Sequence, residues 1–398
     1  MQYRNFRNGF IHYQQNTHMK IKILFLVSFQ SLLLFSAMVY GAVVHKYKLF
    51  PYSLLMFGYN SLQSQHEIPW KFSETPKKYT ENDVEALISI TQSSDVSKQR
   101  KVLLQFLWGQ PKLPSSMPAA IVKDFKDSYY DDIPSIHRID KLLIMMEFGI
   151  ESIVYQFIPK NPNSQVILYH QGHEGGFYNG TKQIRQFIEN GYTVIAFSMP
   201  LKGLNNQPTV KLSLGQIKMT RHDAMRFLVP KQGHSIKYFI EPVIIALNYL
   251  ERNYDYSLVS MVGISGGGWT TTLAAAADTR ISKSFPVAGT YPIYLRLNTT
   301  SSTFGDFEQN EPELYTSVNY LDLYILGGHG KNRKQLQILN KHDPCCFSGT
   351  KGESYKDIVK ARVQQLGTGE FDLLLDDSHH KHMISNLAMS QILEEIKY

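Results

Sequence analysis

Ser265 stands in the stretch GISGG, residues 263–267, which fits the pattern G-x-S-x-G. A serine hydroxyl can attack an acyl carbon once a neighbouring imidazole accepts its proton, and that imidazole needs a carboxylate to fix its tautomer. The pattern alone is weak, since a chain with 26 glycines would match it by chance in roughly one case in seven. The residues around the serine therefore decide whether it is a candidate nucleophile.

The flanking residues meet the structural requirement for a nucleophilic serine. The apolar run YSLVSMV leads into the motif and WTTTLAAAAD follows it, which predicts a buried strand, a sharp turn and a helix. We expect the flanking glycines to adopt positive φ and to let the strand and the helix approach closely. The alternative is a polar residue in a glycine-rich turn.

Candidates for the acid and the base follow later strands. In the strand-turn-helix class of serine enzymes the chain order is serine, acid, histidine, and the histidine comes after the last strand. Asp343 lies just beyond the run QLQILN, and His379, His380 and His382 lie just beyond FDLLLDD. The chain order and the position of the histidines after the last predicted strand therefore both fit this class, and each of the three histidines is a candidate base.

From about residue 136 to the C-terminus the chain resembles the α/β-hydrolase superfamily, with GISGG as nucleophile elbow, HDP as acid loop and HHKHMIS as histidine loop. The resemblance implies Ser265 as nucleophile, Asp343 as acid and a histidine of the last loop as base. We choose His382, because HMIS resembles the usual histidine followed by an apolar position and a helix start. His379 is the alternative.

The loop YHQGHEGGF follows a predicted strand and precedes the first covering helix. In this superfamily that loop supplies one backbone N–H of the oxyanion hole and the residue after the serine supplies the other. The resemblance therefore implies His173 and Gly266. Fixed donors of this kind typically lower the barrier by about 2.7–4 kcal/mol each. The alternative is a glycine-rich surface turn.

The elements that would position these residues have the pattern of an α/β-hydrolase fold. Two apolar runs, 138–146 and 150–159, predict an antiparallel hairpin. Further strands are predicted at residues 165–170, 192–197, 256–263, 283–289, 334–340 and 370–377. Helical segments of ten or more residues separate several of them, which indicates a sheet of about eight strands, mostly parallel, with helices on both faces.

Residues 45–135 are interpreted as a helical covering region and not as an independent domain. The stretch TENDVEALISI opens with a capping-box pattern and predicts a helix, and SKQRKVLLQFLWG predicts a second helix that ends at Gly109. We divide the rest of the chain into a basic segment over 1–22, a membrane span over 23–44 and a catalytic domain over 136–398.

The membrane span is predicted from the uncharged run ILFLVSFQSLLLFSAMVYGAVV. As a helix it would be roughly 33 Å long, enough to cross a bilayer core. A cleaved signal peptide is the alternative, but the cleavage site would be poor. Four basic residues and no acidic one precede the run, which favours a single-pass anchor with the catalytic domain outside the cytoplasm. Orientation is less well determined if Met19 is the true start.

The composition of the chain limits the classes of partner and cofactor that we expect it to bind. The net charge of +7 is modest for 398 residues and no block of lysine and arginine is present, so we expect no nucleic-acid partner. We expect no cofactor and no metal, because Asp376, Asp377 and the three histidines fall in a single loop, whereas closed metal sites usually draw ligands from separated elements. Cys345 and Cys346 are neighbours that either form a disulfide with each other or pack as small apolar residues.

These features together predict a membrane-anchored serine hydrolase that cleaves a carboxylic ester, in a small molecule or on a polymer, through an acyl-enzyme intermediate. A peptidase on the same fold is one alternative, although no repeat that could build a gating propeller is present. A catalytically silent, hydrolase-like ectodomain that binds a partner is the other, although a binding module does not need serine, acid and histidine together.

Overall fold

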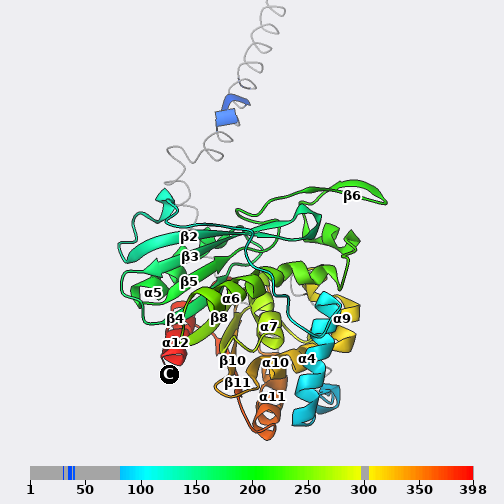
Figure 1. The fold of residues 1–398 in the computed structure, drawn as a ribbon. Coiled ribbons are helices and arrows are strands. Elements are labelled where there is room, and N and C mark those ends of the chain that lie inside the picture. Colours follow the sequence, from blue (N-terminus) through cyan, green and yellow to red (C-terminus); the bar gives the residue numbers. More distant parts are fainter. Residues whose placement is uncertain (1–29, 31–34, 38, 41–80, 297–303, 398) are drawn as a thin grey trace, which may run out of the picture. The chain divides into compact units, whose positions relative to one another are not determined.

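The computed structural model describes residues 30, 35–37, 39–40, 81–296 and 304–397 (Figure 1). From residue 81 onward these residues belong to one compact unit. The predicted basic segment over 1–22 and most of the predicted span over 23–44 lie outside the described residues. None of the helices that are described is long and apolar enough to cross a membrane.

A nine-stranded sheet runs through the described residues in the order β1-β2-β3-β5-β4-β8-β9-β10-β11 (Figure 1). The strands span Ala120–Val122 (β1), Ile136–Met145 (β2), Glu151–Pro159 (β3), Gln165–His170 (β4), Thr193–Phe197 (β5), Leu258–Ile264 (β8), Lys283–Val287 (β9), Lys334–Asn340 (β10) and Glu370–Asp376 (β11). The pairs β1–β2, β2–β3 and β3–β5 are antiparallel, and all later neighbours are parallel. The predicted hairpin and the mostly parallel sheet are therefore confirmed.

Helices cover both faces of this sheet, as predicted. Two of them, α5 (Thr181–Glu189) and α12 (Asn386–Ile396), pack in one core. The other core contains residues of α4 (Ser93–Trp108), α6 (Glu241–Asn253), α7 (Gly266–Ala277), α9 (Pro312–Ser317), α10 (Tyr320–Gly328) and α11 (Glu353–Gln365). Successive strand residues alternate between the two cores, since side chains in a strand point to opposite faces. In β4, for example, Ile167 belongs to the first core and Leu168 to the second.

Short 3-10 helices connect these elements. They span Glu85–Leu87 (η1), Ser128–Tyr130 (η2), Glu147–Gly149 (η3), Phe177–Gly180 (η4), His222–Phe227 (η5), Ser235–Phe239 (η6), Ile293–Leu295 (η7) and Phe307–Gln309 (η8). Two of them, η5 and η8, carry His222 and Glu308, which lie close to His173.

The structure corrects the prediction of a helix over TENDVEALISI. Its described residues form only the 3-10 turn η1, and Ile88 after it is extended. The backbone N–H groups of Ser89 and Ile90 donate to Oδ1 of Asp322 at 2.9 and 3.2 Å. Asp322 is fully buried, so capture of these two donors holds the chain extended where a helix would use them for its own carbonyls. The second predicted helix is confirmed as α4, which Gly109 ends with a φ of 66°.

The structure contains an edge strand and a hairpin that were not predicted from the sequence. The edge strand β1 has three exposed residues, so no alternation of apolar and polar positions marks it in the sequence. The strands β6 (Thr209–Leu212) and β7 (Gly215–Lys218) form a separate hairpin, and only Val210 of its eight residues is buried. Both features lack the burial pattern on which strand prediction depends.

Candidate active site

Ser265 lies at the turn between β8 and α7, with φ 58° and ψ −125°. Such a conformation costs a non-glycine residue about 1–3 kcal/mol and persists only where the surroundings hold it. The Ser265 N–H donates to the Val287 carbonyl at 2.9 Å, and the Ser265 carbonyl accepts from the Trp269 N–H at 3.0 Å. The expectation that the flanking glycines would adopt positive φ is wrong, because the strained dihedral falls on the serine itself.

The glycines around Ser265 permit close approach. A Cβ on Gly172, in the loop after β4, would lie 2.6 Å from Cβ of Ser265. A Cβ on Gly266 would lie 2.4 Å from Cε1 of His173. The loop that follows β4 therefore packs directly against the turn after β8, and no larger residue fits at either position. These contacts place the backbones of His173 and Gly266, the two residues expected to supply an oxyanion hole, beside the serine.

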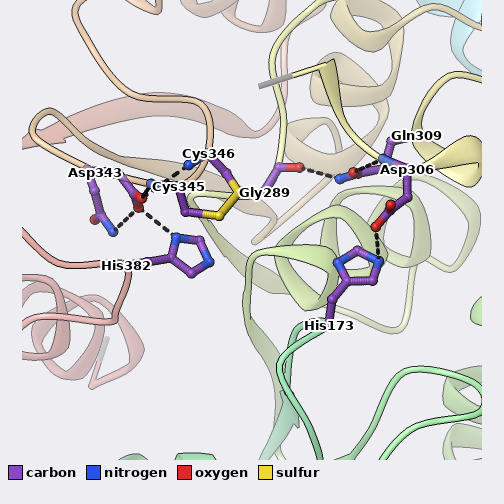
Figure 2. The surroundings of a disulfide bond; sticks show 9 residues. His173, Gly289, Asp306, Gln309, Asp343, Cys345, Cys346 and His382 are labelled. Atoms are coloured by element: carbon purple, nitrogen blue, oxygen red, sulfur yellow. Dashed lines mark hydrogen bonds and ion pairs between the residues drawn. A yellow bond between two sulfur atoms is a disulfide. The ribbon is translucent and has the colours of Figure 1, made fainter. Parts of the chain in front are cut away.

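Asp343, in the loop after β10, forms a hydrogen bond with His382, in the loop after β11 (Figure 2). Oδ2 of Asp343 lies 2.7 Å from Nδ1 of His382 and also accepts from the Asn340 amide at 3.1 Å. Oδ1 accepts from the N–H groups of Cys345 and Cys346 at 2.8 and 3.2 Å. The carboxylate is nearly fully buried and every contact fixes its orientation.

The second nitrogen of the His382 ring is in a different situation. Nε2 is buried and has no hydrogen-bond partner among the described residues. Because a carboxylate only accepts hydrogen bonds, Nδ1 of His382 carries a hydrogen, and a neutral ring then presents a lone pair at Nε2. No hydrogen bond joins His382 to Ser265 in the described part of the chain. The ring is nevertheless in the tautomer that can accept a proton at Nε2.

The other two histidines of the same loop have different partners. Nε2 of His379 lies 3.5 Å from Oδ2 of Asp376, the buried last residue of β11. The ring of His380 stacks on that of His342 with centroids 4.5 Å apart. Among the three candidate bases, His382 is therefore the one that the structure brings to Asp343.

The sheet brings the three loops to one edge. Ile264 of β8 pairs with Val287 of β9, and Val287 pairs with Ile338 of β10, so these residues form a row across parallel strands. Parallel strands end at the same edge of a sheet. Ser265 follows this row directly, and Asp343 lies in the loop that begins after Asn340, the last residue of β10.

Cys345 and Cys346 form a disulfide with each other, which resolves the alternative that the sequence left open. Their sulfur atoms and a ring nitrogen of His382 lie within 4.8 Å of one another. Figure 2 shows the disulfide between the Asp343–His382 pair and Gly289. The cross-link therefore lies in the segment whose N–H groups hold the Asp343 carboxylate.

A second group of titratable side chains surrounds His173, and the sequence did not predict it. Nε2 of His173 lies 2.9 Å from Oδ2 of Asp306 and 2.8 Å from Oε1 of Glu308. Nδ1 of His222 lies 3.5 Å from the same Glu308 oxygen. No spacing pattern could have found this group, since 135 residues separate His173 from Glu308.

The charges in this group shift the pKa values of its members. Burial lowers the pKa of His173, but the hydrogen bonds and charges of Glu308 and Asp306 outweigh burial and raise it to about 9. Burial raises the pKa of Glu308, but His173 and His222 outweigh it and lower that pKa to about 2. The carboxylate of Glu308 is thus ionised although the side chain has no exposed surface.

No protein-family model matches the chain, and no curated protein matches its sequence. Solved structures do match. Acetyl xylan esterase 1 from Thermoanaerobacterium sp. aligns with a TM-score of 0.51 and 14% identity over 81% of this chain and 99% of that one. Methylesterase BT1017 aligns with a TM-score of 0.53 and 13% identity over 77% of this chain and 62% of that one. At such identities the likeness shows the fold, and with the strand order above it confirms the resemblance to the α/β-hydrolases at that level.

Proposed function

We propose that this chain is a serine hydrolase that cleaves carboxylic esters, with Ser265 as nucleophile, His382 as general base and Asp343 as the acid that orients His382. The observation that carries the proposal is the hydrogen bond between Asp343 and Nδ1 of His382, which leaves Nε2 without a partner among the described residues. The strained turn at Ser265 supports it. A binding module has no need of either feature.

The proposed reaction has two halves. Nε2 of His382 takes the proton of the Ser265 hydroxyl while Oγ attacks the ester carbonyl carbon. The tetrahedral intermediate collapses, the C–O bond to the alcohol breaks, and His382 returns the proton to the departing alkoxide. Water then attacks the acyl-enzyme and loses a proton to His382. The bond between the acyl carbon and Oγ of Ser265 breaks, His382 returns that proton to Oγ, and the carboxylic acid leaves.

The backbone N–H groups of His173 and Gly266 are the proposed oxyanion donors. Neither donates to another protein group among the described residues, so both remain open to a ligand oxygen. Such donors contribute most when they are fixed in advance, because no reorganisation is then needed as charge develops. The packing of Gly266 against the His173 ring supports this fixed arrangement.

The first substrates to test are polymer-borne acetyl and methyl esters, since the two similar structures are named as an acetyl xylan esterase and a methylesterase. The membrane anchor over residues 23–44 belongs to the same proposal and rests on the sequence alone. It would hold the hydrolase at a membrane surface, with its domain on the extracytoplasmic side.

A fluorophosphonate probe tests the proposal, because it reacts with an activated serine whatever the natural ester. The full-length wild-type chain should be labelled, whereas the Ser265→Ala and His382→Ala variants should not. Ser257→Ala is the matched control, since Ser257 is an exposed serine just before β8 whose hydroxyl donates to a backbone carbonyl. Full labelling of Ser265→Ala, or no labelling of a folded wild-type chain, would overturn the assignment.

A further inference from the structure

Four side chains converge beside the proposed oxyanion hole. Each offers one atom: Nε2 of His173, Nδ1 of His222, Oδ2 of Asp306 and Oε1 of Glu308. All four atoms lie within 4.8 Å of one another. Three separations are 2.8, 2.9 and 3.5 Å. Ligands around a tetrahedral zinc ion at about 2.0–2.2 Å from the metal are roughly 3.3–3.6 Å apart, so small movements would accommodate the ion.

The four residues come from three separate segments. His173 lies in the loop after β4, His222 begins η5, and Asp306 and Glu308 belong to the segment that forms η8. Closed metal sites usually draw their ligands from separated elements in this way. Figure 2 shows the His173 ring directed toward Asp306.

The two ring nitrogens of His222 have different neighbours. Its Nε2 lies 2.8 Å from the Pro200 carbonyl, which can only accept, so Nε2 carries a hydrogen. The other ring nitrogen, Nδ1, lies 3.5 Å from Oε1 of Glu308. With Nε2 engaged by the Pro200 carbonyl, Nδ1 is the ring nitrogen directed toward the other three side chains.

Glu308 provides a second and independent indication. The side chain has no exposed surface, and its Oε2 has no hydrogen-bond partner among the described residues. A buried carboxylate with an unsatisfied oxygen is costly.

The expectation of no metal was based on the loop after β11 and did not consider these residues. We propose that His173, His222, Asp306 and Glu308 bind a zinc ion. Nitrogen from histidine and oxygen from carboxylates are ligands that zinc accepts in tetrahedral sites. The ion would join the loop after β4 to η5 and η8. Zinc binding itself does not depend on the proposed esterase activity.

The effect of the ion on catalysis does rest on the proposed function. His173 supplies one proposed oxyanion N–H, and its ring packs on Gly266, which supplies the other. A metal that fixes this ring would fix the separation of the two donors. Zinc is therefore assigned a positioning role, with no step of the reaction passing through it.

Zinc content tests the proposal directly. The full-length chain, purified without an affinity tag or chelator and then dialysed, should retain about one zinc ion per chain by elemental analysis. His222→Ala and Glu308→Gln should each lower zinc affinity at least tenfold. His137→Ala is the matched control, because His137 is exposed on β2 and belongs to no ligand cluster of the described residues.

Two further measurements keep the proposal falsifiable if a variant fails to fold. Cobalt added to the metal-free wild-type chain should give the strong visible absorption of tetrahedral coordination. A Cys345→Ser/Cys346→Ser double variant should keep its metal, which separates this site from the cysteine sulfur atoms beside His382. A wild-type chain that holds no zinc and shows no cobalt spectrum would overturn the proposal, and so would a metal lost only with the cysteines.

Activity separates this proposal from the previous one. Chelation should lower kcat with little change in KM, and zinc should restore it, because oxyanion donors act mainly in the transition state. A chain that binds zinc but resists the fluorophosphonate probe would refute the hydrolase and leave the metal site. A chain that is labelled but binds no metal would refute the zinc site and leave the hydrolase proposal standing.

Discussion

His382 and His173 are both held by carboxylates, but the two histidines differ in how many carboxylates hold them. His382 meets Asp343 through one ring nitrogen and keeps the other without a partner among the described residues. His173 directs one nitrogen at two carboxylates, and its ring packs on Gly266. An imidazole with one acidic partner can accept a proton during a reaction. One bound by two carboxylates is suited to holding a position.

The largest effects are expected where a proton must move. Ser265→Ala and His382→Ala should each lower kcat/KM by roughly 10⁴- to 10⁶-fold, and the double variant should be no worse than either single one, because residues that act as one unit are strongly non-additive. Steady-state hydrolysis of an activated acetyl ester measures all three. Multiplied losses in the double variant would mean that the two residues act in different steps.

Asp343→Asn should follow with a loss of about 10⁴-fold, because an asparagine amide no longer holds His382 in the required tautomer. Asp376→Asn is the matched control beside His379. Burial raises the pKa of Asp376, but hydrogen bonds from Ser378 and Ser385 outweigh it, so the pKa is lowered. Ionised Asp376 therefore stabilises the fold above the usual carboxyl pKa, and this contribution is lost on acidification.

The expected outcome for Asp376→Asn is thus a lower melting temperature at neutral pH with most of the turnover retained. Thermal unfolding and hydrolysis measured on the same preparation distinguish the two carboxylates. If Asp376→Asn lost as much activity as Asp343→Asn while remaining folded, the assignment of the acid would be wrong.

His173→Ala should have an intermediate effect, a loss of about 10²-fold in kcat. The variant keeps its backbone N–H but loses the ring that positions it, and misplacement by about 1 Å can cost that much. The pH dependence of the residual activity should keep the wild-type shape, since the proton acceptor is untouched. A changed pH profile would show that the His173 ring itself exchanges a proton in the reaction.

The two histidines also differ in how well their partners could be predicted from the sequence. The Asp343–His382 pair was predicted because both residues lie in the loops just beyond apolar runs that form neighbouring parallel strands, β10 and β11. The partners of His173 were not predicted, because they lie on short 3-10 segments in which no periodic pattern of apolar residues marks the structure. The same limit applies to Asp322, which captures two distant N–H groups and prevents a predicted helix. Local patterns predict elements and the loops after them, whereas contacts between irregular segments depend on the packed fold.

The smallest effect is expected for His379→Ala. His379 was the alternative base, and it lies in the same loop as His382, but its Nε2 lies 3.5 Å from Asp376 and its Nδ1 accepts from the Lys381 N–H at 3.1 Å. Replacing it removes support for the loop and leaves the pair of His382 and Asp343 intact. We expect kcat/KM to fall by less than about tenfold, because this residue is not placed to take the serine proton. The measurement is hydrolysis beside His382→Ala under identical conditions. One short loop can aim a single histidine at the serine, so an inactive His379→Ala with an active His382→Ala would exchange the two roles.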